Sequence, residues 1–150
     1  PPLRAAEDRA ALIEGIKDGT IDMIATDHAP HSLEEKSRGL EHSAMGIVGL
    51  ETAFAALNTH LVRQGIISIE RLVELMSLNP RRVFGIEGGL NVGDRADIVL
   101  LNTKKCWTVD SSQFYSMGKV TMFDGREMTG DVAMTIHRGE VVYNNETRDK

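Results

Sequence analysis

Several residue types and patterns are scarce in this chain, and each scarcity excludes a class of protein. The single cysteine, Cys106, cannot form an internal disulfide, which favours the reducing cytoplasm over an oxidising compartment. No apolar run approaches the roughly 20 residues that cross a bilayer, so no membrane association is expected. Lys and Arg number 17 against 22 Asp and Glu, the net charge is −5, and no basic stripe is present. Nucleic acid is therefore not an expected partner.

The chain otherwise has an ordinary globular composition. Its 150 residues are 41% hydrophobic and 26% charged, which is enough for one domain with a packed core. The chain opens with Pro1-Pro2-Leu3-Arg4 directly before a predicted helix, without a leading strand. We therefore expect that more protein precedes Pro1.

The hydrophobic periodicity predicts an α/β first part and a β-rich last part. Residues 4–18 are predicted to form a helix and residues 21–26 a buried strand, the αβ unit of parallel sheets and barrels. Gly65 is the predicted stop of a second helix and Ser68 the N-cap of a third. The other predicted elements are the second helix at 47–64, the third at 69–78 closed by Asn79-Pro80, and strands at 96–101, 132–137 and 140–143 with a hairpin turn at Arg138-Gly139. The chain thus divides at residues 1–87 and 88–150.

The six residues from Thr26 to His31, which read Thr-Asp-His-Ala-Pro-His, carry most of the expected chemistry. Asp27 follows the predicted strand, where α/β enzymes present catalytic groups, and its carboxylate could bind a metal or move a proton. Alternatively, an aspartate there forms a turn or caps a helix. His31 could bind a substrate carboxylate or act in acid–base chemistry, or it could be a turn histidine bonded to backbone. His28 is expected to be structural.

The long polar segment 27–46 has no core pattern, so it is either a solvated surface loop or a lid over a site. Cys106, beside Trp107, is expected in the core of the β layer rather than as a reactive thiol. The remaining histidines are expected to be structural or solvated: His42, His60 and His137.

The Thr26–His31 motif resembles the strand-8 signature of the dihydroorotases, metal-dependent cyclic amidohydrolases of pyrimidine synthesis. Further resemblances to this family follow in order along the chain. They are Pro1–Arg4, the glycine-rich Ala44–Thr52, the Asn-Pro-Arg-Arg-Val-Phe-Gly segment at 79–85, Gly93–Val99 and His137–Tyr143. Matches in this order over nearly the whole chain are more specific than any one of them. The resemblance implies the C-terminal part of a (β/α)8 TIM-like barrel plus strands of a small β-sandwich domain.

The resemblance also implies a role for each matching residue. Asp27 would be a zinc ligand and the general base that relays a proton to the leaving amide nitrogen. His31 would bind the carboxylate of dihydroorotate, and the backbone of Met45 and Gly46 would meet the pyrimidine ring edge. The implied reaction is the reversible hydrolytic opening of dihydroorotate to N-carbamoyl-aspartate, with zinc as cofactor. A substrate that bears a carboxylate needs a cationic or donor partner, which favours dihydroorotate over hydantoin.

The family's other metal ligands have no matching motif in this sequence: an His-x-His pair, a bridging lysine or carboxylate, and two further histidines. We therefore expect the isolated chain to be inactive and to hold no stoichiometric zinc, because one carboxylate is an incomplete site. Two alternatives stay open, an allantoinase or hydantoinase type of cyclic amidohydrolase and a non-catalytic dihydroorotase-like scaffold. A barrel fragment would expose apolar surface, so we expect a homo-oligomer or association with the missing amino-terminal part.

Overall fold

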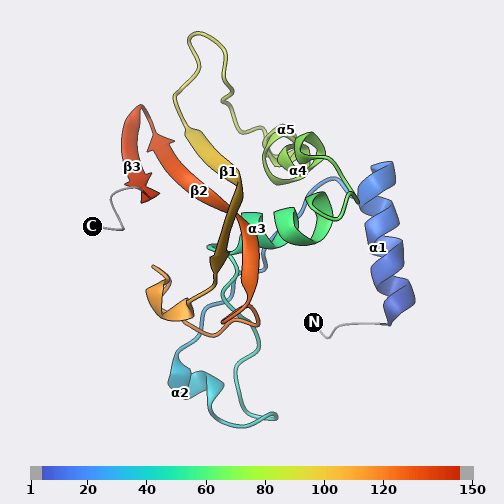
Figure 1. Ribbon diagram of the computed structural model, residues 1–150, viewed down its shortest axis with the longest axis vertical. Coiled ribbons are helices and arrows are strands. Elements are labelled where there is room, and N and C mark those ends of the chain that lie inside the picture. The colour runs from blue at the N-terminus through green and yellow to red at the C-terminus, as the bar shows by residue number, and fades with distance from the viewer. Residues whose placement is uncertain (1–4, 146–150) are drawn as a thin grey trace.

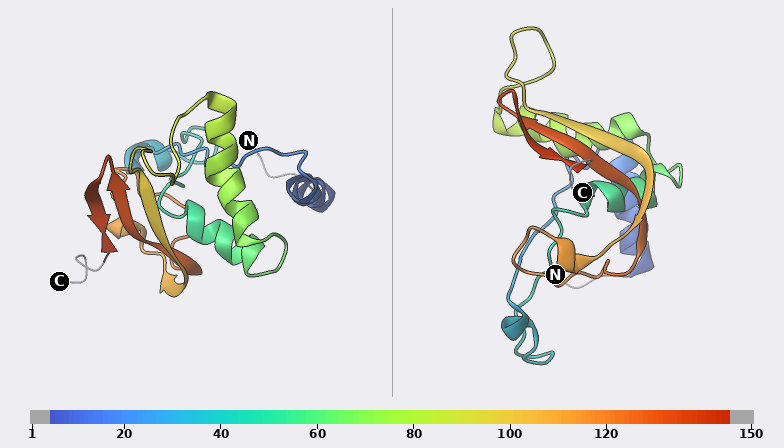
Figure 2. Two further views of the ribbon diagram at one scale, coloured as in Figure 1. Left: turned by 90° about the horizontal axis from the view of Figure 1, so that it is seen from above. Right: turned by 60° about the vertical axis from the view of Figure 1, so that its left-hand side comes forward.

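The computed structural model describes residues 5–145, which form a layer of helices beside an antiparallel sheet (Figure 1). The helices are α1 (Ala6–Asp18), α2 (Leu33–Lys36), α3 (Ala53–Leu57), α4 (Ile69–Val73) and α5 (Asn79–Phe84), with π-helical turns η1 (Asn58–Val62) and η2 (Glu74–Leu78) and a 3-10 turn η3 (Ser111–Gln113). The strands are β1 (Ile98–Thr108), β2 (Glu127–His137) and β3 (Glu140–Asn144), in that order across the sheet. Helix α1 stands on the side away from the sheet, and the segment around α2 projects from the body (Figure 2).

Helix α1 follows the predicted helix at 4–18, although Arg4 and the motif before it lie outside the described residues. Gly19 ends the helix by adopting the left-handed conformation (φ 90°), which glycine reaches without a Cβ clash. Arg71 of α4 holds this end, because its guanidinium donates to the carbonyl of Ile16 at 3.1 and 3.2 Å. The last turn of α1 is thereby tied to the helical layer.

The predicted strand at 21–26 is wrong for the structure described. Residues 21–26 have neither a helical turn nor a ladder contact within residues 5–145, and the nearest one is a parallel bridge from His28 to Ile47, beyond the end of the segment. The N–H of Ile24 donates instead to the carbonyl of Leu75 in η2 at 3.2 Å. A strand requires hydrogen bonds to a neighbouring strand, and the described chain places none beside this segment. The apolar pattern thus gives an extended segment without a sheet.

The second helix begins later than predicted. It starts as α3 at Ala53 rather than at residue 47. The N–H of Val48 donates instead to the carbonyl of Val120, in the β-rich last part of the chain, at 3.0 Å. Gly65 ends this helix as predicted, with a φ of 68°. Ser68 caps α4 as predicted, since its hydroxyl accepts the N–H of Arg71 at 3.2 Å. Local capping signals therefore fix these ends better than periodicity does.

The predicted closure of the third helix at Asn79-Pro80 is wrong, because the chain continues through η2 directly into α5. Pro80 lies at the junction of the π-helical turn η2 and α5, where it removes one intrahelical N–H donor. The Asn79 side chain donates to the carbonyl of Asp22 at 2.8 Å and so holds the extended segment against the helices.

Among the helices of the described chain, none combines the length and apolar character of a membrane span.

The hairpin predicted at Arg138-Gly139 is confirmed. Both residues have positive φ, 51° and 84°, as a two-residue turn between right-twisted strands requires. Strands β1 and β2 are longer than predicted, because Thr108 pairs with Glu127 at the far end of their ladder. The pairing register changes between Asn102 and Cys106, so the ladder is irregular at this point.

Cys106 is exposed, so the prediction that it belongs to the β-layer core is wrong. Its Sγ lies 3.4 Å from the Oγ1 of Thr129 on the facing strand. Successive side chains of a strand point to opposite faces, so the half-buried Trp107 takes the inward face and its neighbour the outward one. The Trp107 indole N–H donates to the carbonyl of Gly130 at 2.8 Å.

Two clusters of buried apolar side chains form the core. The helical and β parts share the first cluster, which consists of Val48, Ala55, Val109, Phe114 and Met128. The second cluster lies among the helices and consists of Phe54, Ile67, Leu72 and Leu75. Asn58 links the layers with hydrogen bonds, because its buried amide donates to the carbonyls of Thr129 at 2.7 Å and Thr103 at 3.2 Å.

Replacing Asn58 by alanine should lower the free energy of unfolding by about 1–3 kcal/mol, because the part-buried carbonyls of Thr103 and Thr129 each lose a donor. Urea unfolding followed by circular dichroism measures this loss. The matched control is His60→Ala, an exposed residue of the same turn η1, which should stay within about 0.5 kcal/mol of wild type. An Asn58→Ala variant as stable as this control would contradict a linking role.

Candidate active site

Asp27 lies at the end of the extended segment, where the chain turns. Its backbone is left-handed (φ 48°), a conformation that aspartate tolerates better than most residues. Its side chain is exposed and makes no hydrogen bond or ion pair within residues 5–145. The carboxylate is therefore available as an oxygen ligand or as a proton acceptor, and it neither caps a helix nor closes the turn by a side-chain bond.

His28 has the structural role that the sequence predicts. Its Nδ1 accepts the backbone N–H of Gly49 at 3.0 Å and that of Leu50 at 3.3 Å. With Nδ1 as acceptor, a neutral imidazole carries its proton on Nε2. Together with the bridge to Ile47, these bonds fix the backbone beside Asp27 to the segment that precedes α3.

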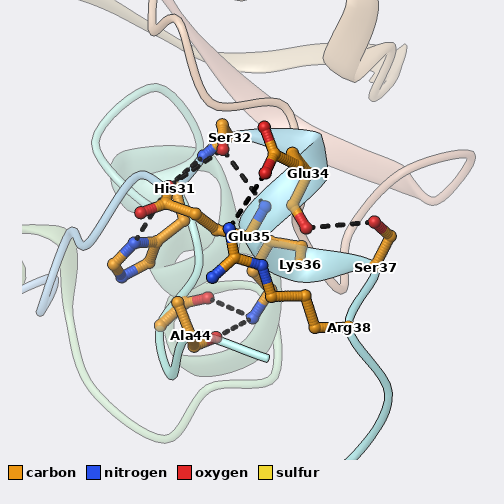
Figure 3. A network of polar contacts seen from close by, with 9 residues as sticks. His31, Ser32, Glu34, Glu35, Lys36, Ser37, Arg38 and Ala44 are labelled. Atoms are coloured by element: carbon orange, nitrogen blue, oxygen red, sulfur yellow. Dashed lines mark hydrogen bonds and ion pairs between the residues drawn. The ribbon is translucent and has the colours of Figure 1, made fainter. Parts of the chain in front are cut away.

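His31 is about 29% exposed and lies next to α2, a helix that the sequence analysis did not predict. Its Nδ1 is 3.7 Å from the Oε2 of Glu35 (Figure 3). The same carboxylate accepts the backbone N–H of Ser32 at 2.9 Å and its hydroxyl at 3.0 Å. These two hydrogen bonds, first the backbone one, and then the nearby charges of His31 and Arg38 lower the pKa of Glu35. An ionised carboxylate therefore faces the imidazole.

Glu35 and Lys36 are residues of the site that the sequence analysis missed. The segment around them was predicted to be a solvated loop or a lid, since it mixes charges of both signs and has no core pattern. Ser32 and Glu35 have the Ser-x-x-Glu spacing of a capping box, and both of its hydrogen bonds are present. That spacing is a signal from which α2 could have been predicted. We call residues 32–46 the α2 arm, which projects from the body of the molecule (Figure 1).

Met45 and Gly46 lie where the α2 arm returns to the body. Met45 is 89% exposed, so its side chain is not held by packing, and only its backbone can have a fixed position. Gly46 has a φ of 121°, and a Cβ there would lie 2.5 Å from the Cβ of Ala29 and 2.9 Å from its carbonyl oxygen. No larger residue fits this close approach. The structure therefore places Gly46 against Ala29, midway between Asp27 and His31 in the sequence.

The β-rich last part of the chain packs against the turn that contains Pro30 and His31. An added Cβ at the buried Gly118 would lie 2.9 Å from the Cβ of Pro30 and 3.1 Å from the backbone of His31. The Glu51 carboxylate holds the loop before Gly118 by accepting the N–H groups of Tyr115 at 2.8 Å and its neighbour at 3.0 Å. The predicted site residues thus gather on a backbone that is buttressed by both halves of the chain.

The comparisons with known proteins agree with this architecture. The profile of the amidohydrolase family matches residues 2–142. This chain belongs to the amidohydrolase family. The dihydroorotases of Caldanaerobacter subterraneus subsp. tengcongensis and of a Thermoanaerobacter species are 50% and 49% identical to it over 143 and 148 residues. These matches cover 95% and 99% of this chain but 33% and 34% of the relatives, so the chain spans about a third of their length.

A solved amidohydrolase structure also matches the fold. The L-hydantoinase (dihydropyrimidinase) from Arthrobacter aurescens superposes with a TM-score of 0.87 at 39% identity, over 96% of this chain and 33% of that structure. The predicted resemblance to dihydroorotases is confirmed, and so is an amidohydrolase fold of mixed helices and strands.

The metal-binding capacity of this amidohydrolase chain is limited within residues 5–145. No group of three or more His, Cys, Asp or Glu side chains there could hold a metal ion. Asp27 by itself fits as one ligand, because its exposed carboxylate is an oxygen donor without a competing partner. A zinc site takes about four ligands, so the others would have to come from elsewhere in the protein. The expected lack of zinc in the isolated chain stays a prediction.

Proposed function

We propose that the protein containing this chain is a zinc-dependent dihydroorotase, which reversibly opens the ring of dihydroorotate to N-carbamoyl-aspartate. The observation that carries the proposal is the placing of His31, with Glu35 beside it at 3.7 Å, in the turn that follows Asp27. An imidazole beside an ionised carboxylate is a suitable hydrogen-bond donor to the carboxylate of a substrate. The identity of about half to curated dihydroorotases supports the same substrate.

Each residue of the site has one task in this proposal. Asp27 takes a proton from the water that attacks the ring amide and delivers it to the leaving nitrogen, a role that an exposed carboxylate without a partner can fill. Zinc, when bound with Asp27 as one of its ligands, would supply Lewis acidity toward the carbonyl and acidify water. His31 holds the substrate carboxylate, and the backbone of Met45 and Gly46 meets the ring edge.

The fold has a matching interpretation. In this proposal the described part of residues 1–87 belongs to the last units of a (β/α)8 barrel, and the described part of residues 88–150 belongs to a small β domain. The extended segment at 21–27 supports this, because it has no neighbouring strand among the described residues and the rest of a barrel would provide one. Exposed apolar side chains such as Leu78 and Phe84 support association with the remainder of the protein or with a second copy.

The substrate preference of the full-length protein tests this function. We expect kcat/KM for dihydroorotate to exceed that for 5,6-dihydrouracil, the same ring without the carboxylate, by roughly 10–100-fold. Steady-state assays with both compounds, and with hydantoin and allantoin, give the comparison. A preference for hydantoin would favour the hydantoinase alternative, which the 39% identity to the Arthrobacter aurescens enzyme keeps open. No turnover of any of these compounds by the zinc-loaded protein would favour a non-catalytic scaffold.

A further inference from the structure

Lys36 binds the backbone at the point where the α2 arm rejoins the body of the molecule. The ammonium of Lys36, the last residue of α2, donates to the carbonyl of Ala44 at 2.7 Å and to that of Gly46 at 2.9 Å (Figure 3). The side chain is part-buried, so these charge-assisted bonds are sheltered from water. Two carbonyls on either side of Met45 are thereby turned toward the same cation.

Further bonds attach the same backbone to α2. The N–H of Ala44 donates to the carbonyl of Glu35 at 3.1 Å, and the hydroxyl of Ser43 donates to the carbonyl of Lys36 at 2.8 Å. On its other side, Gly46 lies against Ala29, whose N–H donates to the carbonyl of Ile47 at 2.9 Å. The Met45–Gly46 backbone is therefore clamped between the α2 arm and the strand-end turn.

This clamp decides which backbone groups remain available to a ligand. A trans peptide plane directs its C=O and N–H in opposite directions, so the carbonyl of Ala44 on Lys36 turns the N–H of Met45 away from the cation. Within residues 5–145, the N–H groups of Met45 and Gly46 make no hydrogen bond. The turn thus offers donors, while its two neighbouring acceptors are taken.

We propose that Lys36 is a positioning residue: it holds the carbonyls of Ala44 and Gly46 so that the N–H of Met45 points away from the ammonium and receives a ring carbonyl oxygen of the substrate. This inference rests on the proposed function for the identity of the ring. Lys36 acts through the backbone and touches no substrate atom. His31 and Lys36 therefore have separable effects, one on the substrate carboxylate and the other on the ring.

The test compares Lys36→Met, which keeps the length of the side chain without its charge, with wild type in the full-length zinc-loaded protein. We expect KM for dihydroorotate and the competitive inhibition constant of 5,6-dihydrouracil to rise together by roughly tenfold, with a smaller change in kcat. Lys36→Arg, which keeps charge and donors, should recover most of both constants. The matched control is Lys17→Met, an exposed lysine of α1, which should stay within about twofold of wild type.

Three outcomes would overturn the proposal. They are unchanged constants in Lys36→Met, a rise confined to dihydroorotate, which would mean that the lysine acts on the carboxylate, and a folded Lys36→Arg variant that is as impaired as Lys36→Met. Should Lys36→Met fail to fold, the Lys36→Arg variant and the shorter donor variant Lys36→Gln decide the question by the same two constants. Failure of the proposed function is distinguishable, because it appears as absent dihydroorotate turnover in wild type.

Discussion

Replacing Asp27 by asparagine in the full-length protein should lower kcat for dihydroorotate by about 10²–10⁴-fold. The amide that replaces the carboxylate cannot accept and pass on a proton, and it is a poor zinc ligand. Asparagine tolerates the left-handed backbone (φ 48°) as aspartate does, so the turn should keep its shape. Steady-state kinetics measures kcat, and elemental analysis of the same sample measures zinc.

The control for this variant is Asp22→Asn, because Asp22 is also exposed and lies at the other end of the same extended segment. It should retain wild-type turnover and zinc content. If Asp27→Asn lost activity and zinc together, the ligand role would dominate. If it lost activity and kept zinc, the proton relay would dominate. Normal turnover in Asp27→Asn would remove Asp27 from the mechanism.

Replacing His31 by alanine should raise KM for dihydroorotate by roughly 10–100-fold, because the substrate carboxylate loses a hydrogen-bond donor. The value of kcat should change less, since the imidazole is proposed to hold the carboxylate rather than the reacting amide. The inhibition constant of 5,6-dihydrouracil should stay near wild type, because that ring has no carboxylate to lose.

The control for His31→Ala is His42→Ala, because His42 is an exposed histidine of the nearby α2 arm and its replacement should leave KM unchanged. The stability of the α2 arm should not change in His31→Ala, because Glu35 keeps its bonds to Ser32 when the imidazole is removed. An equal rise of both constants in His31→Ala would show that the variant disturbs the arm as a whole, contrary to the proposed role.

The parts of the fold that could be predicted are those decided by neighbours in the sequence. The cap at Ser68, the stop at Gly65 and the hairpin at Arg138-Gly139 each depend on one or two residues and their own backbone angles. The parts that could not be predicted depend on distant partners. The segment at 21–26 has a strand pattern without a strand beside it, and α3 begins late because Val48 bonds to the β part.

The same division applies to the candidate site. Asp27, His28 and His31 could be selected because they share one short motif, and Gly46 because the family resemblance covers it. Glu35 and Lys36 could not, since a run of mixed charges does not reveal which charges face inward. Lys36 differs from its exposed neighbours only through carbonyls that lie 8 and 10 residues away in the chain.

The core shared by the two layers has a consequence for how the chain folds during synthesis. Val48 and Ala55 pack against Val109 and Met128, so the partners of the first pair are made more than 50 residues later. Until then the ribosome releases a helical segment with an uncovered apolar face. Contacts of such separation slow folding and leave intermediates that bind each other or chaperones. The order of translation, and not only the final contacts, is therefore a vulnerability of this molecule.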